Sequence, residues 1–102
     1  MIKNIEILES AFQDIEGICR FIMQDNKSAA MKLFDEISEE INTLNVFPFR
    51  GSLVDEQDVA VKDFRYIAVK NYLVFYRIVG DKIVVYHVID GRRDYKKLLQ
   101  GV

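Results

Sequence analysis

The spacing of the apolar residues predicts one strand and two helices in the first half of the chain. Residues 2–8 alternate between apolar and polar side chains, which is the period of a β-strand. From Ser10, which is placed to cap a helix, apolar side chains recur every three or four residues until Asp25 interrupts them. The same spacing returns over residues 28–45 and ends before Pro48, because proline disfavours helical backbone in the residue that precedes it. Two helices with so short a break between them predict an αα-hairpin.

The second half of the chain is dominated by residues typical of strands. A loop is expected over residues 49–62, and a short C-terminal helix over residues 94–100. Between them lie three runs rich in Val, Ile, Tyr and Phe, which predict strands at residues 65–69, 72–78 and 82–89. The connections between these strands are tight, so neighbouring strands are expected to be antiparallel. The whole pattern predicts one α+β domain over residues 1–102, in which an N-terminal strand and an αα-hairpin pack on one face of a twisted antiparallel β-sheet. The other face is expected to remain free for function.

Composition limits the chemistry that the chain can support. Its 102 residues include one cysteine, which cannot form an intrachain disulfide, and one histidine, which is too few for a zinc site. The glycines lack the spacing of a phosphate-binding loop, and no G-x-S-x-G motif is present. No apolar stretch is long enough to cross a membrane, and the first residues lack the layout of a signal peptide. We therefore expect a cytoplasmic protein without metal, cofactor or membrane contact, with Cys19 in its core.

Charge is divided unevenly along the chain, although the formal net charge is only −2. Residues 1–61 contain five basic and twelve acidic side chains, a balance of −7. Residues 62–102 contain nine basic and four acidic side chains, a balance of +5. The basic residues are densest between Gly91 and Lys97, which favours a cationic working surface there. The alternative is that lysines simply cover the solvated sides of the strands.

Four segments in order resemble the RelE/ParE superfamily, the toxins of type II toxin–antitoxin modules. They are an A-x-x-D-[LI] helix opening at residues 11–15, an F-P-x-x-G helix exit at residues 47–51, a strand pair at residues 65–78, and a terminal V-I-D-G-R-R-D at residues 88–94. The resemblance implies a cognate antitoxin as protein partner, with a disordered segment that folds around the toxin, and a toxin–antitoxin hetero-oligomer. An acidic or apolar antitoxin segment is expected to cover the basic sheet face and to mask Arg92 and Arg93.

Some members of this superfamily cut mRNA on the ribosome, and this is the mechanism that we favour from the sequence. Metal-free RNA cleavage needs a base for the 2′-hydroxyl proton, cations for the phosphate and an acid for the leaving oxygen. Arg65, Arg92 and Arg93 suit the phosphate, His87 the proton transfer near neutral pH, and Tyr95 base stacking or proton donation. Each residue also has a structural alternative. Strand alternation places His87 among aliphatic residues as a half-buried side chain, Arg65 is equally suited to pairing with an acid across the sheet, and Tyr95 to packing under the C-terminal helix.

Two departures from the nuclease pattern keep another mechanism open. Asp90 stands where many relatives carry histidine, and the loop over residues 51–61 contains Asp55, Glu56 and Asp58 but no lysine. Other members of the superfamily poison DNA gyrase and need no hydrolytic centre. The alternatives are therefore a non-catalytic gyrase poison or a degenerate member that only binds its antitoxin.

Overall fold

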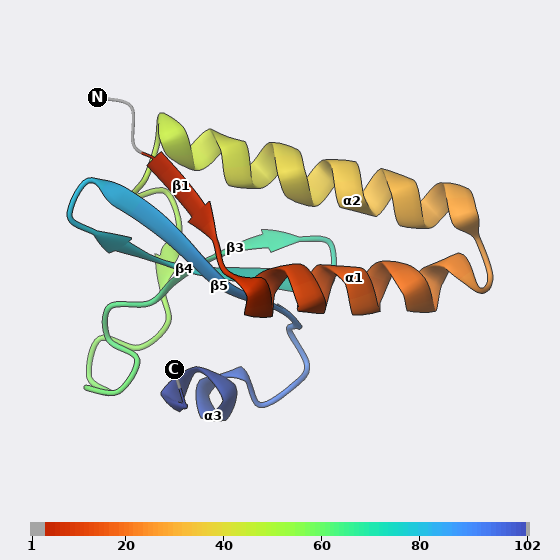
Figure 1. Cartoon of the computed structure of the whole chain (residues 1–102). Helices are drawn as coiled ribbons and strands as arrows, with labels where there is room; N and C mark the ends of the chain where they lie inside the picture. The colour runs from red at the N-terminus through yellow and green to blue at the C-terminus, as the bar shows by residue number, and fades with distance from the viewer. Residues whose placement is uncertain (1–3, 102) are drawn as a thin grey trace.

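A five-stranded sheet organises the chain, of which the computed structural model describes residues 4–101 (Figure 1). The strands are β1 (Asn4–Ile7), β2 (Ser52–Leu53), β3 (Arg65–Val69), β4 (Tyr72–Val79) and β5 (Lys82–Asp90), in the spatial order β1-β5-β4-β3-β2. The β3–β4–β5 meander is antiparallel, as predicted. Strand β1 joins the sheet parallel to β5, and the two-residue β2 pairs antiparallel with β3 inside the segment predicted as a loop.

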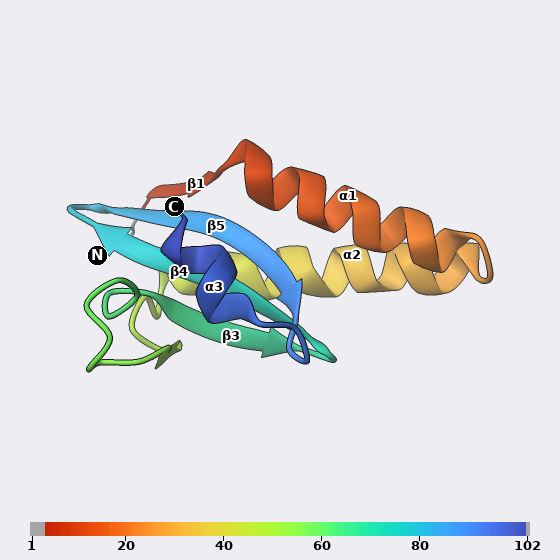
Figure 2. The same cartoon turned by 90° about the horizontal axis from the view of Figure 1, so that it is seen from below.

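The helical hairpin covers one face of the sheet. It consists of α1 (Glu9–Met23) and α2 (Lys27–Asn42), followed by the 3₁₀ turn η1 (Thr43–Asn45). Ser10, expected to cap the first helix, lies inside α1. Helix α2 is capped by Asn26, whose side chain accepts a hydrogen bond from Ala29 N–H at 3.0 Å. Both views show the tip of the hairpin extending beyond the end of the sheet (Figures 1 and 2), which leaves apolar side chains such as Phe21 exposed.

The main core lies between the hairpin and the sheet. Helix α2 contributes the buried residues Ala30, Leu33, Ile37 and Ile41, the apolar face that its spacing predicts. Cys19 is partly buried against this core, and burial raises the pKa of its thiol. The largest fully buried side chain is Tyr76 on β4. Its hydroxyl donates to Pro48 O at 2.7 Å and accepts from Gly51 N–H at 3.0 Å, which attaches the loop after α2 to the sheet.

A second, smaller core covers the face that the sequence left free. Helix α3 (Tyr95–Gln100) crosses this face, with α2 behind the sheet in the view of Figure 2. Phe75 of β4 and Ile89 of β5 are buried there with Leu99 of α3 and with Phe64, the last residue of the loop before β3. Lys96 of α3 donates to Asp55 at 2.6 Å, which ties the loop to the helix. The expectation of an open sheet face was therefore wrong, because the second half of the chain supplies enough apolar side chains to bury it.

Candidate functional site

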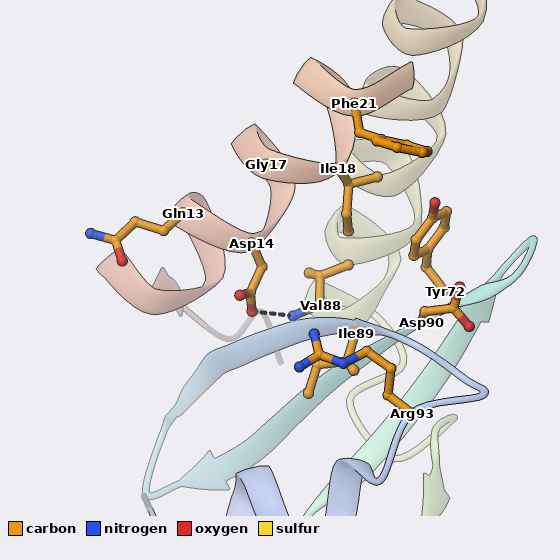
Figure 3. A pocket seen from close by; sticks show the side chains of 10 residues that line it. All are labelled: Gln13, Asp14, Gly17, Ile18, Phe21, Tyr72, Val88, Ile89, Asp90 and Arg93. Atoms are coloured by element: carbon orange, nitrogen blue, oxygen red, sulfur yellow. Dashed lines mark hydrogen bonds between the residues drawn. The ribbon is translucent and has the colours of Figure 1, made fainter. Parts of the chain in front are cut away.

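A groove lies between α1 and the C-terminal end of β5, with a volume of about 510 Å³ (Figure 3). Ile18 and Phe21 of α1 form an apolar wall, and the side chain of Phe21 is 72% exposed. Asp14, Asp90 and Arg93 supply the charges that border it. The groove therefore combines exposed apolar surface with charged groups of both signs.

Asp14 joins α1 to β5 at the base of this groove. Strand β1 ends at Ile7, so the backbone of β5 beyond that point needs other partners. Two side chains one helical turn apart on α1 provide them: Ser10 Oγ donates to Tyr86 O at 2.6 Å, and Asp14 Oδ2 accepts from Val88 N–H at 2.9 Å. Asp14 Oδ2 also lies 2.7 Å from His87 Nδ1. Asp14 belongs to the A-x-x-D segment quoted from the sequence, but its contact with β5 depends on residues more than seventy positions away.

His87 occupies a position that simple alternation along β5 does not give. Phe75 is opposite His87 in the ladder, whereas the next residue, Tyr76, is opposite Val85, so β5 contains a β-bulge. The bulge moves Val88 to the helix-facing core beside Val85. The prediction that His87 lies on this aliphatic face was therefore wrong. The predicted half-burial is found, since the His87 side chain is 23% exposed. Because a carboxylate only accepts hydrogen bonds, a bond from His87 to the Asp14 carboxylate requires the proton on Nδ1, and Nε2 of a neutral ring is then the acceptor.

The turn after β5 contains Arg92 and Arg93 in different environments. Arg92 is 85% exposed and binds Asp90 in a two-bonded pair, with Nε–Oδ1 at 3.0 Å and Nη2–Oδ2 at 2.7 Å. This pair lowers the pKa of Asp90 to about 2 and raises the pKa of Arg92. Asp90 therefore neutralises much of the charge that the sequence assigned to phosphate binding. Arg93 makes no ion pair within residues 4–101, and its side chain borders the groove.

The other two predicted site residues are engaged elsewhere. The Tyr95 ring packs against Phe75 in the second core, with ring centroids 5.2 Å apart. Arg65 Nη1 donates to Gly51 O at 2.8 Å and Phe49 O at 3.3 Å, so its partners are carbonyls and not an acid across the sheet. Arg65 is opposite Tyr76, four residues along β4 from the Tyr72 that borders the groove. At roughly 3.3 Å per residue this is a separation of about 13 Å along the strand, so Arg65 does not join Arg92 and Arg93.

Residues 5–95 match a known family, described as ParE toxin of type II toxin-antitoxin system, parDE. The chain belongs to the ParE toxin family. Its fold is similar to a solved chain of the chromosomal ParDE toxin–antitoxin system from P. aeruginosa, with 15% identity, a TM-score of 0.73, and 87% of this chain and 96% of that chain covered. It is also similar to a chain of the toxin–antitoxin complex RelBE2 from Mycobacterium tuberculosis, with 16% identity, a TM-score of 0.61, and 88% and 99% covered. No curated protein sequence matches it.

The ParE family assignment confirms the resemblance and the α+β fold expected from the sequence, and it makes the chain a toxin of a type II toxin–antitoxin system.

Across the described part of the chain, no three His, Cys, Asp or Glu side chains gather as metal ligands do. Within the same residues, no helix combines the length and the apolar character needed to cross a bilayer. The toxin's groove thus offers an aspartate, Asp14, whose carboxylate contacts His87 outside the groove lining, one arginine without an ion pair in the described chain, and an apolar wall.

Proposed function

We propose that this toxin arrests growth by binding DNA gyrase and does not cut RNA. The observation that carries the proposal is the dispersal of the five residues expected to be catalytic. Arg65, on β3, lies away from the groove, Arg92 is neutralised by Asp90, and the Tyr95 ring is packed on Phe75. Phosphate cleavage needs a base, cations and an acid around one phosphate, whereas a protein-binding toxin needs only a recognition surface. Membership in the ParE family supports the same target, which lies in the cytoplasm.

The antitoxin is the second partner in this proposal. Both similar solved structures come from toxin–antitoxin systems, which supports a hetero-oligomer here too. We place the antitoxin segment along the groove, where exposed Phe21 offers apolar surface and Arg93 offers a cation without an ion pair in the described chain. An acidic and apolar segment that folds there would mask Arg93 and the neighbouring Arg92.

The gyrase proposal is tested with the purified toxin, gyrase and a supercoiled plasmid. The expected result is an increase in linear plasmid after detergent and protease treatment, because a poison stabilises the gyrase–DNA cleavage complex. A parallel translation reaction that contains ribosomes and an mRNA, mapped by primer extension, is expected to show no new 5′ ends. New ribosome-dependent cuts in the mRNA, with the plasmid unchanged, would overturn the proposal.

Ribosome-dependent mRNA cleavage is retained as a second candidate because of the Asp14–His87 pair. The 2.7 Å contact orients the ring and leaves Nε2 as the acceptor, the arrangement that a general base requires. In this mechanism His87 takes the 2′-hydroxyl proton, Arg93 and Arg92 stabilise charge on the phosphate, and Tyr95 stacks on a base or donates a proton. Arg65, away from the groove, contacts the RNA only if the substrate extends along the sheet.

Two substitutions separate the candidates. For a nuclease, His87→Gln and Arg93→Gln should each reduce the rate of mRNA cutting by about 10²-fold or more, the usual size of a general-base or phosphate-stabilising contribution. Arg20→Gln is the matched control, because Arg20 is an exposed arginine on α1 whose ion pair is with Glu16. Full RNA cleavage by both His87→Gln and Arg93→Gln would exclude these catalytic roles.

A further inference from the structure

A second hollow lies at the opposite end of β4 from the groove. Its volume is about 220 Å³, several times the roughly 30 Å³ that one water occupies in the liquid. It is bordered by Phe49, Leu53, Asp63, Arg65, Arg77 and Ile78. Two half-buried arginines and three apolar side chains therefore border the same space. Arg77 is five residues along β4 from Tyr72 of the groove, a separation of about 17 Å at roughly 3.3 Å per residue.

Arg77 is oriented by aromatic rings and not by an acid. Its guanidinium carbon lies 5.4 Å from the centroid of the Phe64 ring and 5.5 Å from that of the Tyr86 ring. A guanidinium held against aromatic rings keeps N–H donors that can still bind an anion. Within residues 4–101, Arg77 forms no ion pair and no side-chain hydrogen bond. Its charge is thus positioned but not neutralised.

Arg65 is held in a similar way. Its guanidinium lies 5.2 Å from the centroid of the Phe49 ring, and Nη1 donates to the carbonyls of Phe49 and Gly51. Within the described chain, Nε and Nη2 have no hydrogen-bond acceptor and the side chain has no ion-pair partner. Asp63 borders the hollow but lies beyond ion-pair distance of both arginines. Arg65 and Arg77 reach the hollow from different surroundings and both border it, so an anion bound there is attracted by two fixed positive charges.

We propose that this hollow binds the carboxylate of an aspartate or glutamate side chain from a protein partner. Guanidinium groups bind planar carboxylates through paired N–H donors, and their fixed orientation reduces the entropy lost on binding. Phe49, Leu53 and Ile78 suit an apolar side chain next to the acid in the partner. A nucleic-acid backbone fits less well, because Asp63 and the net charge of −2 oppose a row of phosphates. The hollow is separate from the groove, and the proposal holds whether the toxin acts on gyrase or on the ribosome.

The test uses the ¹⁵N-labelled full chain and follows the Nε–Hε NMR signals of Arg65 and Arg77. The probes are the capped peptide acetyl-Leu-Glu-Leu-amide, its matched acetyl-Leu-Gln-Leu-amide, and inorganic phosphate. The glutamate peptide should shift both arginine signals in a saturable manner. Its Kd should be about tenfold lower than that of the glutamine peptide. Phosphate should bind more weakly than the glutamate peptide.

Variants then locate the site. Arg77→Gln should weaken binding of the glutamate peptide about tenfold, whereas Arg20→Gln, which removes the same charge from the exposed face of α1, should leave the Kd unchanged. Equal binding of the two peptides by the wild-type chain would overturn the proposal without any variant, even if Arg77→Gln failed to fold. Tighter binding of phosphate, or an equal loss in Arg20→Gln, would also overturn it. Neither gyrase nor ribosomes are present, so the result is separate from that of the growth-arrest assays.

Discussion

Replacement of Asp14 by alanine should loosen the junction between α1 and β5. One oxygen atom, Oδ2, accepts from Val88 N–H at 2.9 Å and contacts His87 Nδ1 at 2.7 Å, and the Asp14 side chain is only 28% exposed. Each lost hydrogen bond costs about 1 kcal/mol, and an unsatisfied buried donor adds to this, so we expect Asp14→Ala to lower the free energy of unfolding by about 2–3 kcal/mol. In a domain of this size that corresponds to a fall in Tm of roughly 8–24 °C. Asp14→Asn retains an oxygen acceptor, so its cost should stay below about 1 kcal/mol.

Urea unfolding followed by circular dichroism measures these differences, and thermal unfolding provides a second estimate of each. The matched control is Glu16→Ala, which removes an exposed acid of α1 that, within residues 4–101, forms an ion pair only with Arg20. Its effect should lie within about 0.5 kcal/mol of zero, as is usual for exposed pairs. If Asp14→Ala also fell within that range, or if Asp14→Asn were as destabilising as Asp14→Ala, the hydrogen-bond acceptor would not be the reason for the aspartate.

Two further predictions concern contacts away from this junction. Tyr76→Phe removes both loop hydrogen bonds of a buried hydroxyl, at 2.7 and 3.0 Å, and should lower the free energy of unfolding in urea by about 1–3 kcal/mol. Tyr72→Phe, at a partly exposed side chain, is the control, and equal losses would contradict the reasoning. For Asp90, whose pKa is about 2, Arg92→Gln should return the pKa toward 3.8 in an NMR titration of the carboxyl carbon. Because the folded-state pKa is the lower one, the stabilisation by ionised Asp90 is complete above about pH 4 and is lost as the pH falls toward 2; an unchanged pKa in Arg92→Gln would refute the assigned cause.

The regular elements could be predicted because local spacing determines them. The buried residues of α2 recur every three or four positions, and β4 places Val74 and Tyr76 on the helix side and Phe75 on the other, as alternation requires. Spacing alone does not decide burial at every apolar position of α2. Phe34 falls within the apolar spacing of α2 but is exposed, whereas Leu33 and Ile37 are buried; it borders a surface hollow together with Met23 and Met31.

The candidate site was harder to predict because its geometry depends on contacts between distant residues. Arg92, Arg93 and His87 were identified from their chemistry and from the family resemblance. Chemistry and resemblance did not predict the environments of these side chains. Asp90 neutralises Arg92, and a β-bulge moves His87 away from the aliphatic face. No local pattern shows that β5 contains one extra residue, Tyr86, without a partner on β4. The pairing of β4 with β5 decides this, because it must satisfy the backbone of both strands at once.

The sequence by itself determined the kind of domain: period-3.6 and period-2 segments in a fixed order, with too few cysteines and histidines for a disulfide or zinc site. These properties are local or compositional, so no long-range contact is needed to see them. Tertiary structure alone decided which charges remain available. Arg92 and Asp14 are engaged by partners across a turn or across the fold, whereas Arg93, Arg65 and Arg77 have no ion-pair partner within residues 4–101. Whether a charge can bind a partner depends on the groups within a few ångströms of it, and only folding brings those groups together.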